Sequence, residues 1–185
     1  MIAVVDSEAI VGGLARGDTR AFDAAYDRHR AALHAFLVRL SGSTALAEDL
    51  LQETWLRLAR HCRELSPDTE LRAWLFTVAR NLYRSHRRWA VLDAGRLREL
   101  GLLPAKSAPS PFESTAESEA RRELEAALAD LPLEHREVLL LCSVSGFEPS
   151  EAAGILGISP EATRQRLARA RAKMRERLRT REVIT

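Results

Sequence analysis

The stretch that decides the fold runs Glu151-Ala-Ala-Gly-Ile-Leu-Gly-Ile-Ser-Pro-Glu-Ala-Thr-Arg-Gln-Arg-Leu167. Gly157 favours the left-handed backbone conformation that turns a chain sharply at the end of a short helix. After the turn, Ser159 is a good N-cap residue, and Pro160 suits the first helical position because its missing N–H would have no partner there. The pattern therefore predicts a helix-turn-helix, with helices at residues 149–156 and 160–180.

The second helix of this motif has an apolar stripe and a basic face. The residues predicted to face the core are Thr163, Leu167, Ala170, Met174 and Leu178. Arg and Gln are suited to bidentate bonds with guanine and adenine edges. The residues predicted to read duplex DNA are Arg164, Gln165, Arg166 and Arg169. Residues 160–181 carry nine bases and two acids, a net charge of +7 that suits a helix near phosphates. A solvated helix that packs by its stripe and binds nothing is the alternative.

The N-terminal half also follows the 3.6-residue apolar period of helices, without the alternation typical of a strand. Asp18 is a suitable N-cap for a first helix, and Ser41-Gly42-Ser43 ends that helix. Three helices are predicted here, from Asp18 to Leu40, from Thr44 to His61 and from Thr69 to Ala90.

Between these regions, Pro, Ser, Ala and Thr dominate residues 104–118 and few residues can form a core, as is typical of a linker. Residues 91–103 show a weaker helical pattern, and further helices are predicted at 119–130 and 133–145. The predicted fold class is all-α: two small helical modules joined by a flexible linker, the C-terminal one a helix-turn-helix. The predicted boundaries are 1–92 for the first module, 93–117 for the linker and 118–185 for the second module.

The predicted helix at residues 69–90 carries a core stripe and a separate basic face. The stripe consists of Leu71, Trp74, Leu75, Val78 and Leu82. The arginines of the other face are Arg80, Arg84, Arg87 and Arg88, and no acidic residue occurs between Glu70 and Asp93. Asn81 and Tyr83 lie among these bases and offer an amide for base edges and a ring for stacking. Such a mixed surface suits unpaired nucleic acid.

The predicted helix at residues 44–61 carries a compact polar patch. Its members are i, i+4 neighbours: Glu48, Asp49, Gln52 and Glu53. Paired carboxylates can hold a metal or transfer protons, but no histidine, nucleophile or glycine-rich loop accompanies them in the sequence. A solvated face and a docking patch for a partner protein are the two interpretations left open, and catalysis is not expected.

Composition excludes several classes of protein. The 185-residue chain is 46% hydrophobic and 29% charged, a soluble globular mixture without the roughly 20-residue apolar run of a membrane span. Its first residues lack the basic flank of a secretory signal. Cys62 and Cys142 are too few and too far apart in sequence for a disulfide framework, and the histidines do not pair at ligand spacing. We expect a cytoplasmic protein without metal or cofactor, whose cysteines are ordinary thiols rather than a redox switch.

Four blocks of this sequence resemble one protein family when taken in order. They are Ala47-Glu-Asp-Leu-Leu-Gln-Glu-Thr-Trp-Leu-Arg-Leu58, Leu71-Arg-Ala-Trp-Leu-Phe-Thr-Val-Ala-Arg-Asn-Leu82, Leu131-Pro-Leu-Glu-His-Arg-Glu-Val-Leu-Leu-Leu141 and the helix-turn-helix. Together they resemble the extracytoplasmic-function (ECF) sigma factors of bacterial RNA polymerase. The resemblance covers residues 8–90 and 120–177, which is nearly all of the chain outside the predicted linker.

The resemblance implies a role for each surface. The segment with Asp49, Gln52 and Glu53 would dock on the β′ clamp helices of core RNA polymerase, and the β flap is a second polymerase contact. The −35 element of promoter DNA would be read by Arg164, Gln165, Arg166 and Arg169. The −10 element would be melted and read by Arg63, Ser66, Arg80, Asn81, Arg84, Arg87 and Arg88. An anti-sigma factor would be a further partner, and the chain itself would be no enzyme.

Two residues depart from the family pattern, which often has a small residue in place of Glu161 and an apolar one in place of Thr163. The −35 sequence preference therefore stays open. The main rival is a stand-alone helix-turn-helix regulator that binds duplex DNA without polymerase. Two further rivals are a helical enzyme built around the acidic patch, which would need a metal or a pocket, and a purely protein-binding adaptor.

Overall fold

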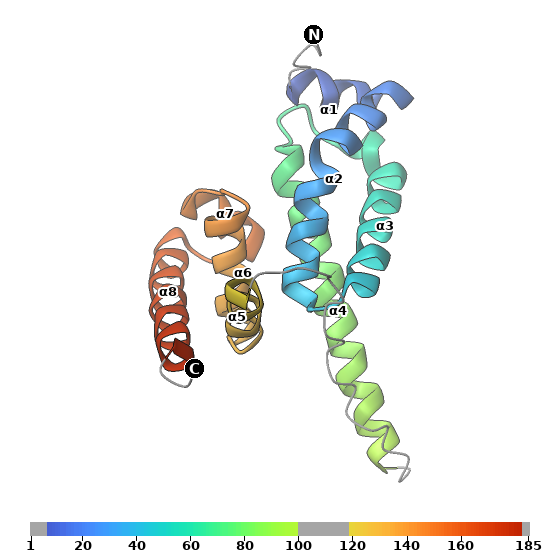
Figure 1. The fold of residues 1–185 in the computed structure, drawn as a ribbon. Helices are drawn as coiled ribbons and strands as arrows, with labels where there is room; N and C mark the ends of the chain where they lie inside the picture. Colours follow the sequence, from blue (N-terminus) through green and yellow to red (C-terminus); the bar gives the residue numbers. More distant parts are fainter. Residues whose placement is uncertain (1–6, 100–118, 183–185) are drawn as a thin grey trace.

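The computed structural model describes residues 7–99 and 119–182, and every regular element in these ranges is helical, so the predicted all-α class is confirmed. The first module contains α1 (Ser7–Ala15), α2 (Thr19–Ser41), α3 (Thr44–His61), the 3₁₀ turn η1 (Cys62–Glu64) and α4 (Leu71–Glu99). The second contains α5 (Glu119–Ala129), α6 (Leu133–Leu139), the π-helical turn η2 (Leu140–Val144), α7 (Pro149–Leu156) and α8 (Pro160–Glu182). The modules lie side by side, and the distal half of α4 projects beyond them (Figure 1).

The helices α2 and α3 begin and end at the residues whose local signals predicted them. The Asp18 side chain accepts a hydrogen bond from the N–H of Arg20 at 2.9 Å, and Gly42 ends α2 with a left-handed φ of 72°. Ser43 Oγ then accepts from the N–H of Leu46 at 3.3 Å. These bonds satisfy backbone groups that helix ends leave without partners, so both predicted helices are confirmed.

The helix α1 is an element that periodicity did not predict. Its Ile10, Val11 and Leu14 side chains are buried, and it packs on α2. Gly13 lies so close to α2 that an added Cβ would stand 2.5 Å from the Cβ of Ala21. The missing side chain at Gly13 therefore allows the two helices to approach.

The helix α4 is longer than predicted. It continues past residue 90 to Glu99, through the range 93–99 that was predicted as linker. No proline occurs between residues 90 and 104, and Leu and Arg favour helix, so Gly95 lowers the helix propensity by about 1 kcal/mol without ending α4. The remainder of the predicted linker, residues 100–117, lies outside the described residues.

The buried face of α4 also differs from the predicted stripe. Leu71 and Leu75 are buried as predicted, whereas Trp74, Val78 and Leu82 are only half-buried. The face is completed instead by Phe76, Ala79 and Tyr83. Helical spacing alone could not show which residues of α4 are buried, because a second packing partner covers another side of this helix.

That partner is the second module. The ring centroid of Phe76 lies 5.1 Å from that of Phe36 on α2 and 4.9 Å from that of Phe147 in the loop before α7. Between the modules, α4 packs on α7 and α2 packs on η2. The described parts of the modules therefore share a continuous apolar interior.

The helix-turn-helix is confirmed in detail. Gly157 adopts a left-handed φ of 69° after α7, and Ser159 Oγ accepts a hydrogen bond from the N–H of Ala162 at 3.1 Å to begin α8. The residues of the predicted core stripe are buried or half-buried: Thr163, Leu167, Ala170, Met174 and Leu178. Because this stripe packs against the core, the opposite face of α8 points outward.

The predicted helix at residues 133–145 is correct in extent but not in winding. It is α-helical only to Leu139, and the π-helical turn η2 follows, with the N–H of Ser145 bonded to the carbonyl of Leu140 at 2.8 Å. The wider turn brings Phe147 back toward the interior, where its N–H bonds to the carbonyl of Leu141 at 3.0 Å.

Candidate nucleic-acid and protein interfaces

The outward face of α8 presents three of the four predicted duplex-reading residues. Arg164, Gln165 and Arg169 are exposed, while Arg166 is half-buried and its Nη2 lies 3.8 Å from Glu134 Oε2 of α6. After the cap at Ser159, Arg164 and Gln165 lie in the second turn of the helix, and Arg169 follows about one turn later. An exposed face with two arginines and a glutamine can reach base edges in a major groove.

Glu161 organises this face in the absence of DNA. Its carboxylate accepts hydrogen bonds from Arg164 Nη2 at 2.9 Å and from Gln165 Nε2 at 3.0 Å. These two bonds, with the charge of Arg164, lower the pKa of Glu161. Glu161 thus holds two side chains that are predicted to read DNA in defined positions near the start of the helix.

The basic face of α4 is divided into exposed and covered parts. Asn81, Arg87 and Arg88 are exposed, whereas Arg84 is half-buried and Arg80 is buried. Arg80 therefore belongs to the predicted face but is buried. Its guanidinium is buried because the second module supplies an acidic partner.

That partner is Glu137 of α6, whose side chain is fully buried. Arg80 Nε lies 3.2 Å from Glu137 Oε1, and Arg80 Nη1 donates to the carbonyl of Ile155 at 3.1 Å. Burial raises the pKa of Glu137 and lowers that of Arg80, and the attraction between the two groups opposes both changes. The pair is thus a buried ionic contact between the modules.

Tyr83 was predicted among the bases as a stacking ring, but it is buried and belongs to the core. Its place on the sequence between arginines gave no signal for this. Arg63 in η1 and Ser66 in the loop that follows it are exposed, and the N–H of Thr69 bonds to the carbonyl of Ser66 at 2.9 Å. Arg87 lies about 24 Å further along the helix from Leu71. The loop thus precedes α4, and the exposed arginines lie further along that helix.

The predicted docking patch lies on the outer face of α3. Asp49 and Gln52 are exposed, and Glu53 is half-buried with its Oε1 3.3 Å from Arg57 Nε. Since the pair is largely exposed, it contributes little to stability. The structure thus brings all three predicted docking residues together on one accessible face of the first module.

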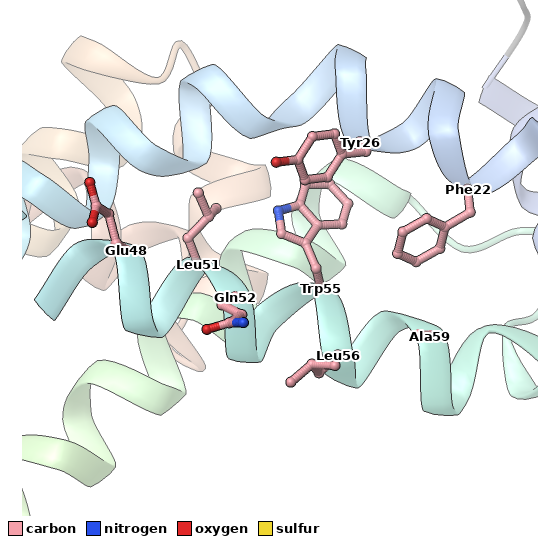
Figure 2. A pocket seen from close by; sticks show the side chains of 8 residues that line it. All are labelled: Phe22, Tyr26, Glu48, Leu51, Gln52, Trp55, Leu56 and Ala59. Carbon is pink, nitrogen blue, oxygen red and sulfur yellow. The ribbon is translucent and has the colours of Figure 1, made fainter. Parts of the chain in front are cut away.

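An apolar groove beside this patch was not predicted. It has a volume of about 470 Å³ and lies between α2 and α3 (Figure 2). The lining residues are Phe22, Tyr26, Glu48, Leu51, Gln52, Trp55, Leu56 and Ala59. The Tyr26 and Trp55 ring centroids are 4.9 Å apart, and Leu56 is 43% exposed. No local sequence signal indicated this groove, because its lining comes from two helices, α2 and α3.

Within residues 7–99 and 119–182, no group of three His, Cys, Asp or Glu side chains is placed to hold a metal ion. The same residues include no helix with the length and hydropathy of a membrane span. Cys62 and Cys142 are both free thiols, and burial raises the pKa of Cys142.

Comparisons with known proteins agree with this geometry. Residues 25–90 match the sigma-70 region 2 family, and residues 121–174 match sigma-70 region 4. The chain is 40% identical to the ECF RNA polymerase sigma factor EcfG of Rhodopseudomonas palustris over 77% of this chain and 76% of that one. It is 37% identical to the RNA polymerase sigma factor CarQ of Myxococcus xanthus over 86% and 90%.

The fold agrees as well. The structure of CnrH in complex with the cytosolic domain of CnrY superposes with a TM-score of 0.70 and 27% identity, covering 94% of this chain and 97% of that one. These similarities favour the sigma-factor interpretation over a stand-alone regulator. The matches to sigma-70 regions 2 and 4 and to these named relatives show that the chain belongs to the ECF sigma factors of RNA polymerase.

Proposed function

We propose that this chain docks on core RNA polymerase and directs it to promoters with paired −35 and −10 elements. The observation that carries the proposal is the exposed face of Arg164, Gln165 and Arg169 on a capped recognition helix. It stands in a chain whose relatives are named RNA polymerase sigma factors. The helix would lie in the major groove of the −35 element, where these side chains match base edges.

The helix α3 would contact core polymerase. Asp49, Gln52 and Glu53 supply a polar rim, and the groove beside Trp55 and Leu56 supplies an apolar centre. A polar rim around an apolar centre is the usual anatomy of a protein interface. The partner surface suited to it is a helix with cationic residues around an apolar side chain, as expected of the β′ clamp helices, and the β flap is the proposed contact of the second module.

The −10 element would be captured as unpaired DNA by the first module. The residues available for this in the described structure are Arg63 and Ser66 ahead of α4, and Asn81, Arg87 and Arg88 on that helix. Arg84 and Arg80 would join them once Glu137 has moved away. Opening the duplex costs a few kcal/mol of unstacking, which contacts to captured bases offset.

The two modules would act together through polymerase. Each alone makes a modest contact with DNA that weakens as salt rises. Held on one polymerase at a fixed spacing, the two contacts combine as one avid interaction. The chain would perform no bond chemistry itself, since polymerase does so, and it would work in the cytoplasm where polymerase and promoter meet.

An anti-sigma factor is a proposed further partner. The similar protein CnrH was solved in complex with the cytosolic domain of CnrY. In this chain, the groove between α2 and α3 and the acidic patch beside it are accessible surfaces for such a partner. Occupation of them would compete with polymerase.

The proposed docking surface is tested by retention of the chain on immobilised bacterial core polymerase that lacks a sigma factor. The double variant Asp49→Ala with Glu53→Ala is expected to lower retention by about two- to thirtyfold, since each exposed charge pair at an interface rim contributes about 0.2–1 kcal/mol. The matched control is Asp23→Ala with Asp27→Ala, which removes the same charge at the same spacing from exposed positions on α2.

The control variant is expected to bind polymerase like the wild type, and both double variants to bind duplex DNA unchanged. Equal retention of wild type and the α3 variant would show that the polymerase contact lies elsewhere.

A further inference from the structure

Three exposed side chains are joined by hydrogen bonds near the start of α8. The Glu161 carboxylate accepts from Arg164 through Oε2, at 2.9 Å from Nη2 and 3.3 Å from Nε. Its other oxygen, Oε1, accepts from Gln165 Nε2 at 3.0 Å. Each carboxylate oxygen therefore holds one of the two side chains that are predicted to read the −35 element, so either bond can persist without the other.

The chemistry of the carboxylate decides which end of the Gln165 amide faces it. The bonds from Arg164 and Gln165 lower the pKa of Glu161, so this group is ionised near neutral pH. An ionised carboxylate only accepts hydrogen bonds, whereas a glutamine amide has a donor end, Nε2, and an acceptor end, Oε1. Because Nε2 is turned toward Glu161, Oε1 is the end left to accept a bond from DNA.

The orientation of the Gln165 amide matters because the major-groove edges of the bases differ in the same property. Adenine and cytosine present amino groups there, which donate hydrogen bonds. Thymine and guanine present keto oxygens, which accept them. A glutamine that rotates freely can turn its donor end to the keto bases or its acceptor end to the amino bases. A glutamine held by its donor end favours the amino bases.

Glu161 is better suited to hold a neighbouring side chain than to contact a base itself. Both of its carboxylate oxygens already accept bonds from side chains of its own helix. Its negative charge is also repelled by the phosphates that surround a major groove. Gln165 lies one helical turn further along and is exposed, so the bond between them requires no change in the core.

We propose that Glu161 is a positioning residue that sets the base preference at one position of the −35 element, by holding the Gln165 amide so that its oxygen meets adenine or cytosine. The proposal rests on the proposed function for the contact between α8 and DNA, but not for the orientation of Gln165 in the free chain. A purely structural role is the alternative, since an acid in the first turn stabilises a helix through its dipole. That role would change stability and leave the selected base unchanged.

The orientation is tested by NMR of the side-chain amides in the isotope-labelled full-length chain. The sequence contains only three such amides, those of Gln52, Asn81 and Gln165, so each signal can be assigned by substitution. Glu161→Ala is expected to shift the Gln165 signals and to leave those of Gln52 and Asn81 in place. Unchanged Gln165 signals in this variant would overturn the proposed orientation.

The base preference is tested by selecting duplex DNA with randomised −35 regions in complexes of the chain with bacterial core polymerase. Loss of preference in Gln165→Ala identifies the position that this residue reads. There the wild type is expected to select adenine and cytosine over guanine and thymine by about two- to tenfold, as one hydrogen bond allows. Glu161→Ala is expected to select both classes about equally.

The matched control is Glu176→Ala, which removes the same charge from an exposed position further along α8. It is expected to select the same sequences as the wild type, because it leaves the bond between Glu161 and Gln165 intact. A change of preference in this control equal to that in Glu161→Ala would show an effect of charge alone and would overturn the proposal.

The double variant Glu161→Ala with Gln165→Ala separates positioning from direct reading. If Glu161 acts through Gln165, the double variant selects the same sequences as Gln165→Ala alone. A further change in the double variant, or a preference in Glu161→Ala equal to that of the wild type, would overturn the proposal. Absence of any selected sequence in the wild type would count against the proposed function, while the amide signals would still decide the orientation of Gln165.

Discussion

The substitution Arg164→Ala tests whether α8 reads base sequence. In the free chain both Nε and Nη2 of Arg164 donate to Glu161 Oε2, at 3.3 and 2.9 Å. These two groups form one edge of the guanidinium, which is the edge that would otherwise grip a guanine in bidentate fashion. Binding to a −35 element therefore either breaks these bonds or uses the remaining edge.

The magnitude follows from this competition. A bidentate arginine–guanine contact discriminates by about 1–3 kcal/mol. Because the exposed contact with Glu161 offsets part of that gain, we expect Arg164→Ala to lose about 1–2 kcal/mol, or about five- to thirtyfold in −35 affinity. The loss should be confined to promoters that carry the preferred base at one position.

The assay selects randomised −35 regions in complexes of the chain with core polymerase and sequences the retained DNA. Arg171→Ala is the matched control, because it removes the same charge from the same helix at a side chain that bonds to Ser143 Oγ. Arg171→Ala is expected to leave the selected sequences unchanged, and only Arg164→Ala to relax one base position. Identical selected sequences for the two variants would refute base reading by Arg164.

Two further predictions concern the first module. Burial and the charges of Arg28 and Arg72 lower the pKa of His29 from 6.5 to about 4, so the unfolded chain binds a proton between these values that the folded chain does not. The free energy of unfolding, measured with urea, should therefore fall by about 2 kcal/mol from pH 7 to pH 5. The fall should be smaller in His29→Gln. Equal falls in the variant and the wild type would contradict the lowered pKa of His29. Gly13→Ala should cost about 1–3 kcal/mol, because its Cβ would stand 2.5 Å from that of Ala21. An unchanged melting temperature would show that α1 shifts freely.

The parts of the fold that follow local rules could be predicted from the sequence. Gly157, Ser159 and Pro160 determine the turn and cap of the helix-turn-helix through bonds that span only a few residues. Asp18 and Ser43 do the same for α2 and α3. The surfaces on α8 and α3 followed because the helical period fixes which residues lie opposite a core stripe.

The parts that depend on packing between distant segments could not be predicted. Arg80 and Tyr83 belong by spacing to an exposed basic face, yet both are buried because the second module supplies Glu137 and Phe147 to α4. Glu137 itself stands among other charged residues and gives no sign of burial. The groove beside Trp55 likewise requires α2 and α3 to be placed against each other, which no local pattern specifies.

The central claim is that this chain confers promoter recognition on polymerase. It is tested most directly by transcription from a promoter library with the purified chain and bacterial core polymerase lacking any sigma factor. The account predicts start sites that share paired −35 and −10 elements, and no specific starts without the chain. Absence of both transcription and co-elution with polymerase, together with tight binding of the chain alone to duplex DNA, would contradict it.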